Sequence, residues 1–348
     1  MRELFKIMKF ENDYEFWLYV SKFEKMFAKY SSVKYALGTH SGTAALQLSL
    51  IACGIGDRDE VITVPNTYIA TALAISNVGA RPVFVDIDEE TYNIDINKIE
   101  EAITDKTKAI IPVHLYGNPA EMKRIMRLAK KYNLKVIEDA CQAHGAEYSG
   151  KKVGSIGDAG CFSFFTSKNL SCLGNGGMIA TDSRKISEMI RILRDPEANS
   201  PHLLLSKRTP CYLDAIQVAF LKPKLKYLDK WNELRRRKAK IYSELLSDTD
   251  IITPVETKKA KHVYFTYVIR TKRRDKLRRF LHRKGIETWI EYETPIHLTK
   301  TFKYLGYKKG DFPVTERVSQ EILSLPISPF LKDEEIVKIC KTIKNYVK

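Results

Sequence analysis

Residues 60–88 read EVITVPNTYIATALAISNVGARPVFVDID, and this stretch decides the fold class. EVITV (60–64) and RPVFVDID (81–88) are short runs rich in valine and isoleucine, a composition typical of strands. Between them, IATALAISNVG (69–79) is typical of a helix that ends at a glycine. A strand, a helix and a second strand in this order predict two parallel strands joined by a crossover helix.

The same alternation extends over residues 40–182. Further strands are predicted at AIIPVHLYG (109–117), KVIED (135–139), AGCFSFF (159–165) and GGMIATD (176–182), and further helices at TAALQLSLIACG (43–54) and PAEMKRIMRLAKKYNL (119–134). Gly54 and Gly79 are expected to cap helices at their C-termini. The pattern predicts an α/β fold with a largely parallel sheet, and ligands of such sheets gather at the carboxyl ends of the strands.

The remaining part of the chain has a different pattern. A long helix is expected over residues 214–247, with Pro223 bending it near its start. After it, residues 262–270, a basic helix, residues 285–292 and a terminal helix from about 332 predict a small α+β unit. No internal repeat or low-complexity linker separates the two parts, so we expect them to pack together.

The net charge of +16 is compatible with nucleic acid, an anionic small substrate or a lysine-rich surface. The basic runs 232–240 and 270–285 carry apolar residues at helical spacing, which favours solvated helix faces. No recognition motif accompanies these runs, so we do not expect specific binding of nucleic acid.

No apolar run approaches the ~20 residues of a membrane span, and the start MRELFKIMKF does not resemble a signal peptide. We therefore expect a cytoplasmic protein without a membrane partner. The six cysteines include no C-x-x-C pair, which favours reduced thiols over a disulfide framework or a zinc site. The seven histidines show no metal-ligand spacing, so no metal site is predicted.

Polar residues lie where strands are expected to end. Ser41, Gly42 and Thr43 begin a helix, where they could bind an anion such as phosphate or serve only as a cap. Asp139 ends the strand KVIED, and Lys168 follows after one further strand. These two side chains could face one cleft as catalytic groups or form a simple ion pair.

Pyridoxal phosphate chemistry would combine these residues. The cofactor needs a lysine for a Schiff base, a carboxylate at its pyridine nitrogen and donors for its phosphate. Tyr68, after the strand EVITV, could stack on the ring, or it could be an aromatic residue of the core.

The chain resembles the DegT/DnrJ/EryC1/StrS family of sugar aminotransferases over about residues 20–345. The matching stretches are SGTAALQL, GDRDEVITVPNTYIATALAISNVGARPVFVDIDEETYNID, IPVHLYGNPAEM, VIEDACQAHGA, FSFFTSKNL with GNGGMIATD, and GDFPVTERVSQEILSLPISP. The resemblance implies the three-layer fold type I of pyridoxal-phosphate-dependent transferases, with a mixed, mostly parallel central sheet. It also implies a shortened N-terminal segment (1–24), a large cofactor-binding domain including the long helix (25–240) and a small C-terminal domain (241–348).

The resemblance also implies roles for individual residues. Lys168 would form the Schiff base and then move the proton between substrate and cofactor, while Asp139 would keep the pyridine nitrogen protonated. Gln142 would lie beside the ring, and Tyr68 would stack on it. The residues expected to bind the phosphate are Gly42, Thr43 and Ser163, and the candidate substrate residues are His144, Tyr292 and His297. A structural histidine remains an alternative for His144.

The implied reaction moves an amino group from glutamate to a nucleotide-linked ketosugar. NTYIATALAIS and GIETWIEY resemble most the branch that acts on dTDP-linked 3-keto-6-deoxyhexoses, while UDP- or dTDP-linked 4-ketosugars stay open. A homodimer is expected, because relatives build each site from two chains.

Several positions depart from the family pattern. Tyr19 lies near an expected glycine, and RTPCYLDAIQ places Pro210 near an expected asparagine and Tyr212 near an expected arginine. Glu291 lies where many relatives have histidine, and Asn175 lies where aspartate is common. The altered residues at the expected contact between subunits, Pro210 and Tyr212, motivate an alternative function, a cofactor-binding paralogue with little catalysis that acts as a regulator or partner subunit.

Overall fold

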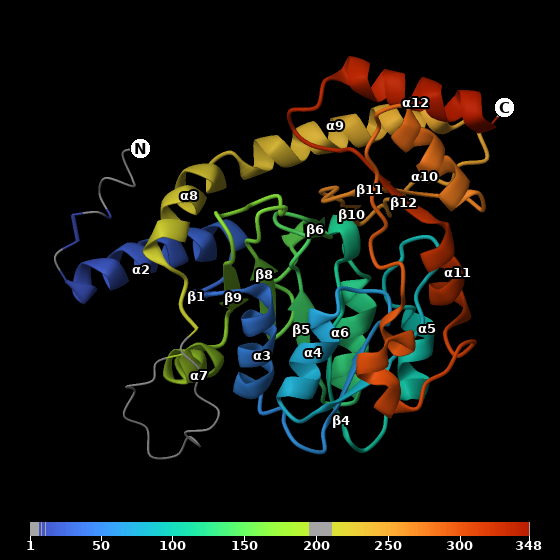
Figure 1. The fold of residues 1–348 in the computed structure, drawn as a ribbon. Helices are drawn as coiled ribbons and strands as arrows, with labels where there is room; N and C mark the ends of the chain where they lie inside the picture. The colour runs from blue at the N-terminus through green and yellow to red at the C-terminus, as the bar shows by residue number, and fades with distance from the viewer. Residues whose placement is uncertain (1–6, 8, 11, 195–210, 348) are drawn as a thin grey trace.

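A seven-stranded sheet forms the centre of the molecule, with strand order β1-β9-β8-β5-β4-β2-β3 (Figure 1). The computed structural model describes residue 7, residues 9–10, residues 12–194 and residues 211–347. The strands are β1 Tyr35–Thr39, β2 Glu60–Thr63, β3 Arg81–Phe84, β4 Thr107–Ile110, β5 Lys135–Asp139, β8 Ala159–Ser163 and β9 Gly177–Thr181. β3, β2, β4, β5 and β8 pair in parallel, and β9 is antiparallel to both neighbours. The predicted mixed, mostly parallel sheet is thus confirmed.

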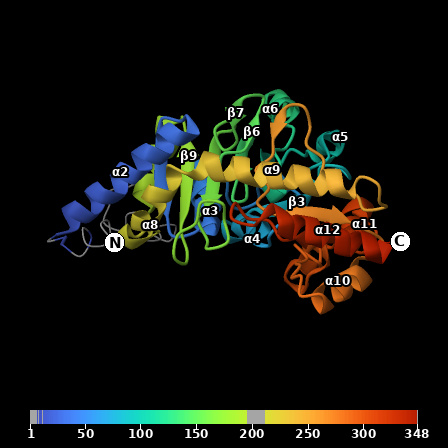
Figure 2. The ribbon, with the colours of Figure 1, turned by 90° about the horizontal axis from the view of Figure 1, so that it is seen from above.

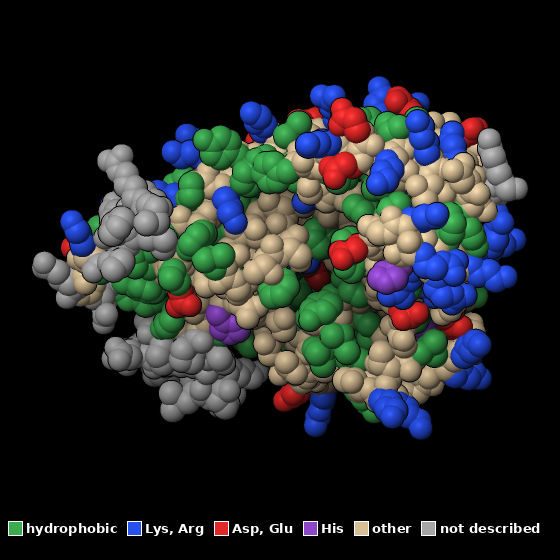
Figure 3. All heavy atoms as spheres, turned by 45° about the horizontal axis from the view of Figure 1, so that its top comes forward, with side chains coloured by type: hydrophobic (Ala, Val, Ile, Leu, Met, Phe, Trp, Pro, Cys, Tyr) green, Lys and Arg blue, Asp and Glu red, His purple; other side chains and the backbone are tan. Residues whose placement is uncertain are grey.

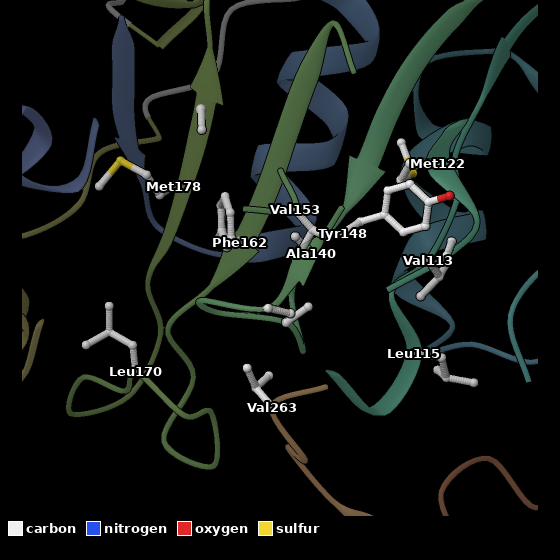
Figure 4. Packing of buried hydrophobic residues seen from close by; sticks show 14 of the residues in the cluster. Val113, Leu115, Met122, Ala140, Tyr148, Val153, Phe162, Leu170, Met178 and Val263 are labelled. Atoms are coloured by element: carbon white, nitrogen blue, oxygen red, sulfur yellow. The ribbon is translucent and has the colours of Figure 1, made fainter. Parts of the chain in front are cut away.

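Helices cover both faces of this sheet and make three layers. One face carries α3 Gly42–Ala52, α4 Ala70–Asn77 and α7 Arg184–Arg194, and the other carries α2 Asp13–Ser31, α5 Ile96–Ile99, α6 Met122–Lys131 and α8 Ala215–Leu225. Successive strand residues pack into opposite layers, as Val136 and Phe162 do on one face and Ile137 and Cys161 on the other. Figure 4 shows Phe162, Ala140, Val153 and Met178 within one of these layers.

Several predicted strands are shorter than the apolar runs suggested. The run 109–117 was expected to be one strand, but β4 ends at Ile110 and Leu115–Gly117 form a 3-10 turn. Pro112 has no N–H for the ladder, and the positive φ of Tyr116 and Gly117 turns the chain. The runs 81–88 and 159–165 likewise leave the sheet early, at Phe84 and Ser163. Gly54 and Gly79 have φ of 83° and 86° just beyond α3 and α4, as expected for C-terminal caps.

The expected long helix is two helices, α8 and α9 (Leu228–Leu246). Pro223 lies inside α8, and the helix breaks between Leu225 and Leu228. A proline removes one backbone donor and its ring crowds the preceding turn, which weakens α8 near its end.

The C-terminal part forms its own core around a two-stranded antiparallel sheet, β11 Tyr267–Arg270 with β12 Ile322–Leu325. Its helices are α10 Arg274–Arg283, α11 Pro313–Glu321 and α12 Asp333–Val347, and α12 packs along α9 (Figure 2). Residues 285–292 contribute only a bridge between Trp289 and Ser324. Because α9 contributes Leu228 to the first core and Tyr242 to this one, the proposed boundary near residue 240 falls inside a helix.

The remaining elements are short. They are the strands β6 Glu147–Tyr148, β7 Lys151–Lys152 and β10 Ala260–Lys261, and the 3-10 helices Glu100–Ala102, Ile296–Leu298 and Lys300–Leu305. Among the described residues, no helix combines the length and the apolar character needed to cross a membrane. All six cysteines are free.

Candidate active site

A cavity of about 360 Å³ lies at the carboxyl ends of the parallel strands. The large part of the chain lines it with Gly42, Tyr68, Asp139, Ser163 and Lys168, and the C-terminal part with Phe265, Glu291 and Tyr292. Each of the first group follows or ends a strand, because that edge of a parallel sheet is where loops converge.

The N-terminus of α3 opens into this cavity. Ser41 caps the helix, and its hydroxyl accepts a hydrogen bond from the Ala44 N–H at 3.1 Å. A Cβ on Gly42 would lie 2.8 Å from both Ser163 Cβ and Cys141 Sγ, so glycine alone lets the first turn approach β8 this closely. The first N–H groups of the helix, beside the half-buried Ser163 and Thr43, form a suitable cradle for an anion.

Asp139 ends β5 and is almost fully buried. Its Oδ2 accepts a hydrogen bond from Thr71 Oγ1 at 2.8 Å, and its Oδ1 accepts one from the Cys141 N–H at 3.2 Å. The Thr71 hydroxyl thus uses its proton on the carboxylate. In the 3.1 Å hydrogen bond between Thr67 Oγ1 and Thr71 Oγ1, Thr67 is therefore the donor. These bonds fix the orientation of the carboxylate and leave it lone pairs for one more donor.

Lys168 lies in the turn that follows β8, with its Nζ 4.3 Å from the centroid of the Phe265 ring. Burial lowers the pKa of Lys168, against the opposing influence of Cys141, Asp139 and Glu291. In the part of the chain that the structure describes, Lys168 and Asp139 form no ion pair. The lysine is therefore not held in the simple ion pair that the sequence left open, and its burial makes the neutral, nucleophilic form of the amine easier to reach than in a free lysine.

Gln142 is held on both sides. Its Oε1 accepts a hydrogen bond from the Tyr116 N–H at 2.6 Å, and its Nε2 donates one to Tyr292 Oη at 2.6 Å. The Tyr68 ring is 60% exposed, which excludes the alternative of a core aromatic, and its centroid lies 6.2 Å from that of Tyr292. An amide and two aromatic rings thus border one side of the cavity.

The sequence profile of the DegT/DnrJ/EryC1/StrS aminotransferase family matches residues 11–344. The chain belongs to this family. A dTDP-3-amino-3,6-dideoxy-alpha-D-galactopyranose transaminase from Aneurinibacillus thermoaerophilus is 45% identical to it over 327 residues, which cover 94% of this chain and 90% of that protein. A pleiotropic regulatory protein from Geobacillus stearothermophilus is 44% identical over 334 residues, 94% of this chain and 89% of that protein.

An X-ray crystal structure of S. venezuelae DesV in complex with a ketimine intermediate superimposes with a TM-score of 0.91. That chain is 38% identical, and the match covers 95% of this chain and 89% of that chain. The likeness confirms the predicted three-layer fold of pyridoxal-phosphate-dependent aminotransferases, and the chain is an enzyme of this kind.

The residues present fit the cofactor of this family. Four kinds of group meet in one cavity. They are a buried carboxylate with a free lone pair, a desolvated lysine, an exposed aromatic ring, and a helix N-terminus at which only glycine has room. These are the groups that a phosphorylated pyridine aldehyde requires.

Two predicted substrate residues do not line the cavity. His144 is buried between Phe162 and Phe164, and burial together with the Lys168 charge lowers the pKa of His144 to about 3. His297 is buried against Phe312 and pairs with Glu316 at 3.1 Å. Neither imidazole borders the cavity, whereas Tyr292 does line it.

Sequence reasoning missed Thr71 and Phe265. Thr71 carried one usable signal, because it lies one helical turn after Thr67 at the start of α4. Phe265 carried no signal in the sequence, because backbone hydrogen bonds to a distant segment place it at the site. Its N–H donates to Tyr116 O at 2.9 Å, and the Val263 N–H donates to Gly117 O at 3.1 Å.

The structure shows the surroundings of four of the five positions that depart from the family pattern. Glu291 lines the cavity, and burial raises its pKa while the Lys168 charge lowers it. Tyr19 is buried against Phe10, and Tyr212 packs edge-on against Trp17. Asn175 is exposed at the cavity rim, and Pro210 lies outside the described residues.

Proposed function

We propose that the enzyme moves an amino group from glutamate to a nucleotide-linked ketosugar, with pyridoxal phosphate bound in the cavity. The convergence of Lys168, Asp139 and the N-terminus of α3 on one cavity carries this proposal. The cofactor supplies an aldehyde carbon and an electron-withdrawing pyridine ring.

The protein's own groups would divide the remaining work. Lys168 Nζ, with its lowered pKa, is the nucleophile and the carrier of the transferred proton. Asp139, whose carboxylate Thr71 orients, would keep the ring nitrogen of the cofactor protonated, and Tyr68 would stack on the ring. Gln142, fixed by Tyr116 and Tyr292, would lie beside the ring.

Water exclusion and anchoring fall to other residues. Gly42, Thr43 and Ser163 hold the phosphate at the helix N-terminus. Phe265 covers Lys168 from the C-terminal part of the chain and keeps the amine dry.

A dTDP-linked 3-keto-6-deoxyhexose is the proposed acceptor. The support is the similarity to a relative named for a dTDP-3-amino-3,6-dideoxy sugar. The 4-keto sugars linked to UDP or dTDP are the alternatives that a substrate panel must include.

One observation favours a second candidate function, a cofactor-binding regulator with little catalysis. A relative of 44% identity is named a pleiotropic regulatory protein. The carboxylate of Glu291 inside the cavity also departs from the family pattern and would repel an anionic substrate unless it is paired.

A homodimer is also proposed. α2 and α8 pack together and carry the exposed apolar side chains of Trp17, Leu18 and Ile216, and Phe165 is exposed at the cavity. An apolar surface beside a site is typical of an interface. Light scattering should give twice the chain mass of 40.0 kDa, and a monomeric mass would contradict the dimer.

The two half-reactions test the function. Adding glutamate to the cofactor-loaded enzyme should replace the visible absorption band by the near-ultraviolet band of the amine form of the cofactor. A panel of nucleotide ketosugars should then restore the visible band with the true acceptor. Binding of the cofactor without any spectral change on adding glutamate would favour the regulator.

A further inference from the structure

A second concave site, a groove of about 680 Å³, lies on the C-terminal part of the chain. One face of α10 forms one wall, and Glu287, Thr288 and Trp289 form the other. No residue of this groove lines the cavity that holds Lys168.

The α10 wall is strongly cationic. Its residues recur at the spacing of one helix face, and they are Asp275, Arg278, Arg279, His282 and Arg283. Leu277 and Leu281 bury the opposite face, so this stripe is held toward solvent. Positive charge therefore gathers along a rigid helix.

The acidic residues of the groove do not cancel this charge. Asp275 pairs at 2.6 Å with the buried Arg274, which is not part of the groove lining, and Glu287 is the other carboxylate that lines the groove. Arg278, Arg279 and Arg283 form no ion pair with a carboxylate anywhere in the described ranges. Unpaired guanidinium groups on one face are suited to phosphate oxygens, which they can bind in a bidentate manner.

Trp289 supplies an aromatic surface opposite these charges. Its side chain is 51% exposed. Its backbone is fixed, because its N–H donates to Ser324 O at 3.2 Å and its carbonyl accepts from the Ser324 N–H at 2.8 Å. An exposed indole on a fixed backbone is a suitable platform for stacking a flat ring.

The groove adjoins the candidate active site along the chain. Trp289 is two residues before Glu291, which lines the cavity, so their Cα atoms are at most about 7 Å apart. Figure 3 shows Lys and Arg side chains gathered on one side of a central hollow. One elongated ligand could thus occupy both sites.

We propose that this groove binds the nucleoside diphosphate portion of the substrate, with the diphosphate on Arg279 and Arg283 and the base on Trp289. This inference rests on the proposed function, because it places the sugar in the cavity. A single aromatic platform fits one base, whereas sites for single-stranded nucleic acid combine a charged track with several stacking residues. The groove volume is also within the usual ~300–1,000 Å³ of small-ligand sites.

Titration with dTDP alone tests the groove directly. Tryptophan fluorescence of the cofactor-loaded enzyme should be quenched on binding, and Trp289→Ala should remove most of the quench and weaken binding about tenfold. Trp289→Phe, which keeps a ring, should recover part of that affinity.

The double variant Arg279→Ala/Arg283→Ala should weaken dTDP binding at least about tenfold. Lys276→Ala is the matched control, because it removes an exposed cation of α10 outside the groove and should leave the affinity for dTDP unchanged.

Kinetics separate this inference from the proposed function. In the double variant the KM for the nucleotide ketosugar should rise much more than the KM for glutamate. An equal dTDP affinity in wild type and double variant overturns the inference, even where transamination proceeds. Failure of the glutamate half-reaction in the wild type overturns the proposed function, while the dTDP titration still decides the groove. A single-stranded oligonucleotide that binds more tightly than dTDP and depends on the same arginines would assign the groove to nucleic acid and overturn the inference.

Discussion

The cavity and the α10 groove hold their polar groups in opposite ways. In the cavity, Asp139 is fixed by Thr71 and Cys141, and Gln142 is fixed by Tyr116 and Tyr292. In the groove, the guanidinium groups are exposed and have no carboxylate partners within the described residues. Groups that act on a reacting centre must be placed in advance, whereas groups that capture an anion can act through charge at longer range.

The largest effect should come from the cavity, where the chemistry is expected. Lys168→Ala should lower turnover by at least about 10³-fold, because the variant lacks both the nucleophile and the proton carrier. A coupled assay with glutamate and ketosugar measures this loss. The control Lys185→Ala removes an exposed lysine of α7 and should keep full turnover. Turnover above a few per cent in Lys168→Ala would contradict the assigned role.

The interior beneath the cavity should respond to acid. His144 has a pKa of about 3 in the folded protein and an ordinary value of 6.5 when unfolded, so between these values only the unfolded chain takes up this proton. The free energy of unfolding should therefore fall as the pH falls from 6.5, by at most about 1.4 kcal/mol per pH unit from this group.

The variant His144→Phe should reduce that slope, because phenylalanine keeps the packing against Phe162 and Phe164 without titrating. Urea unfolding at several pH values between 7 and 4 measures it. A residual slope is expected from His262, whose pKa burial also lowers to about 3. An unchanged slope in His144→Phe would show that this imidazole does not contribute.

Loss of the hydrogen bond that orients Asp139 should have an intermediate effect on turnover. Thr71→Val removes the hydroxyl that donates to Asp139 Oδ2 and should lower turnover about tenfold, the cost of one hydrogen bond to a charged group. Thr71→Ser, which keeps the hydroxyl, should recover most of the activity. Equal turnover in Thr71→Val and wild type would separate Thr71 from the orientation of Asp139.

The smallest expected effect is the salt dependence of substrate binding, which should come from the groove and not from the cavity. Raising the salt concentration from about 0.05 to about 0.5 M should raise the KM for the nucleotide ketosugar a few-fold, because the exposed arginines are screened by ions. The kcat should change much less, since the cavity contacts are short and buried. The Arg279→Ala/Arg283→Ala variant should show a weaker dependence of KM on salt. A KM independent of salt in the wild type would remove the contrast between the two regions.

The local sequence pattern was sufficient to predict the strands and helices and to single out the polar residues at the ends of the strands. The alternation of strand and helix runs predicted the parallel sheet, and Asp139 and Lys168 were singled out because they follow strands. Patterns of this kind depend on residues close together in the chain, which is why they can be read without coordinates. The run 109–117 failed because Pro112 and the turn at Tyr116 interrupt the ladder inside an apolar stretch.

What the amino-acid sequence alone determined, therefore, was the fold class, the family and the groups at the strand ends. Only the tertiary structure decided that Phe265 covers Lys168, that Thr71 orients Asp139, and that His144 and His297 lie outside the cavity. It also placed Trp289 across a groove from the arginines of α10. Such contacts join segments far apart in the chain, and packing between those segments sets them, with no trace in local composition or spacing.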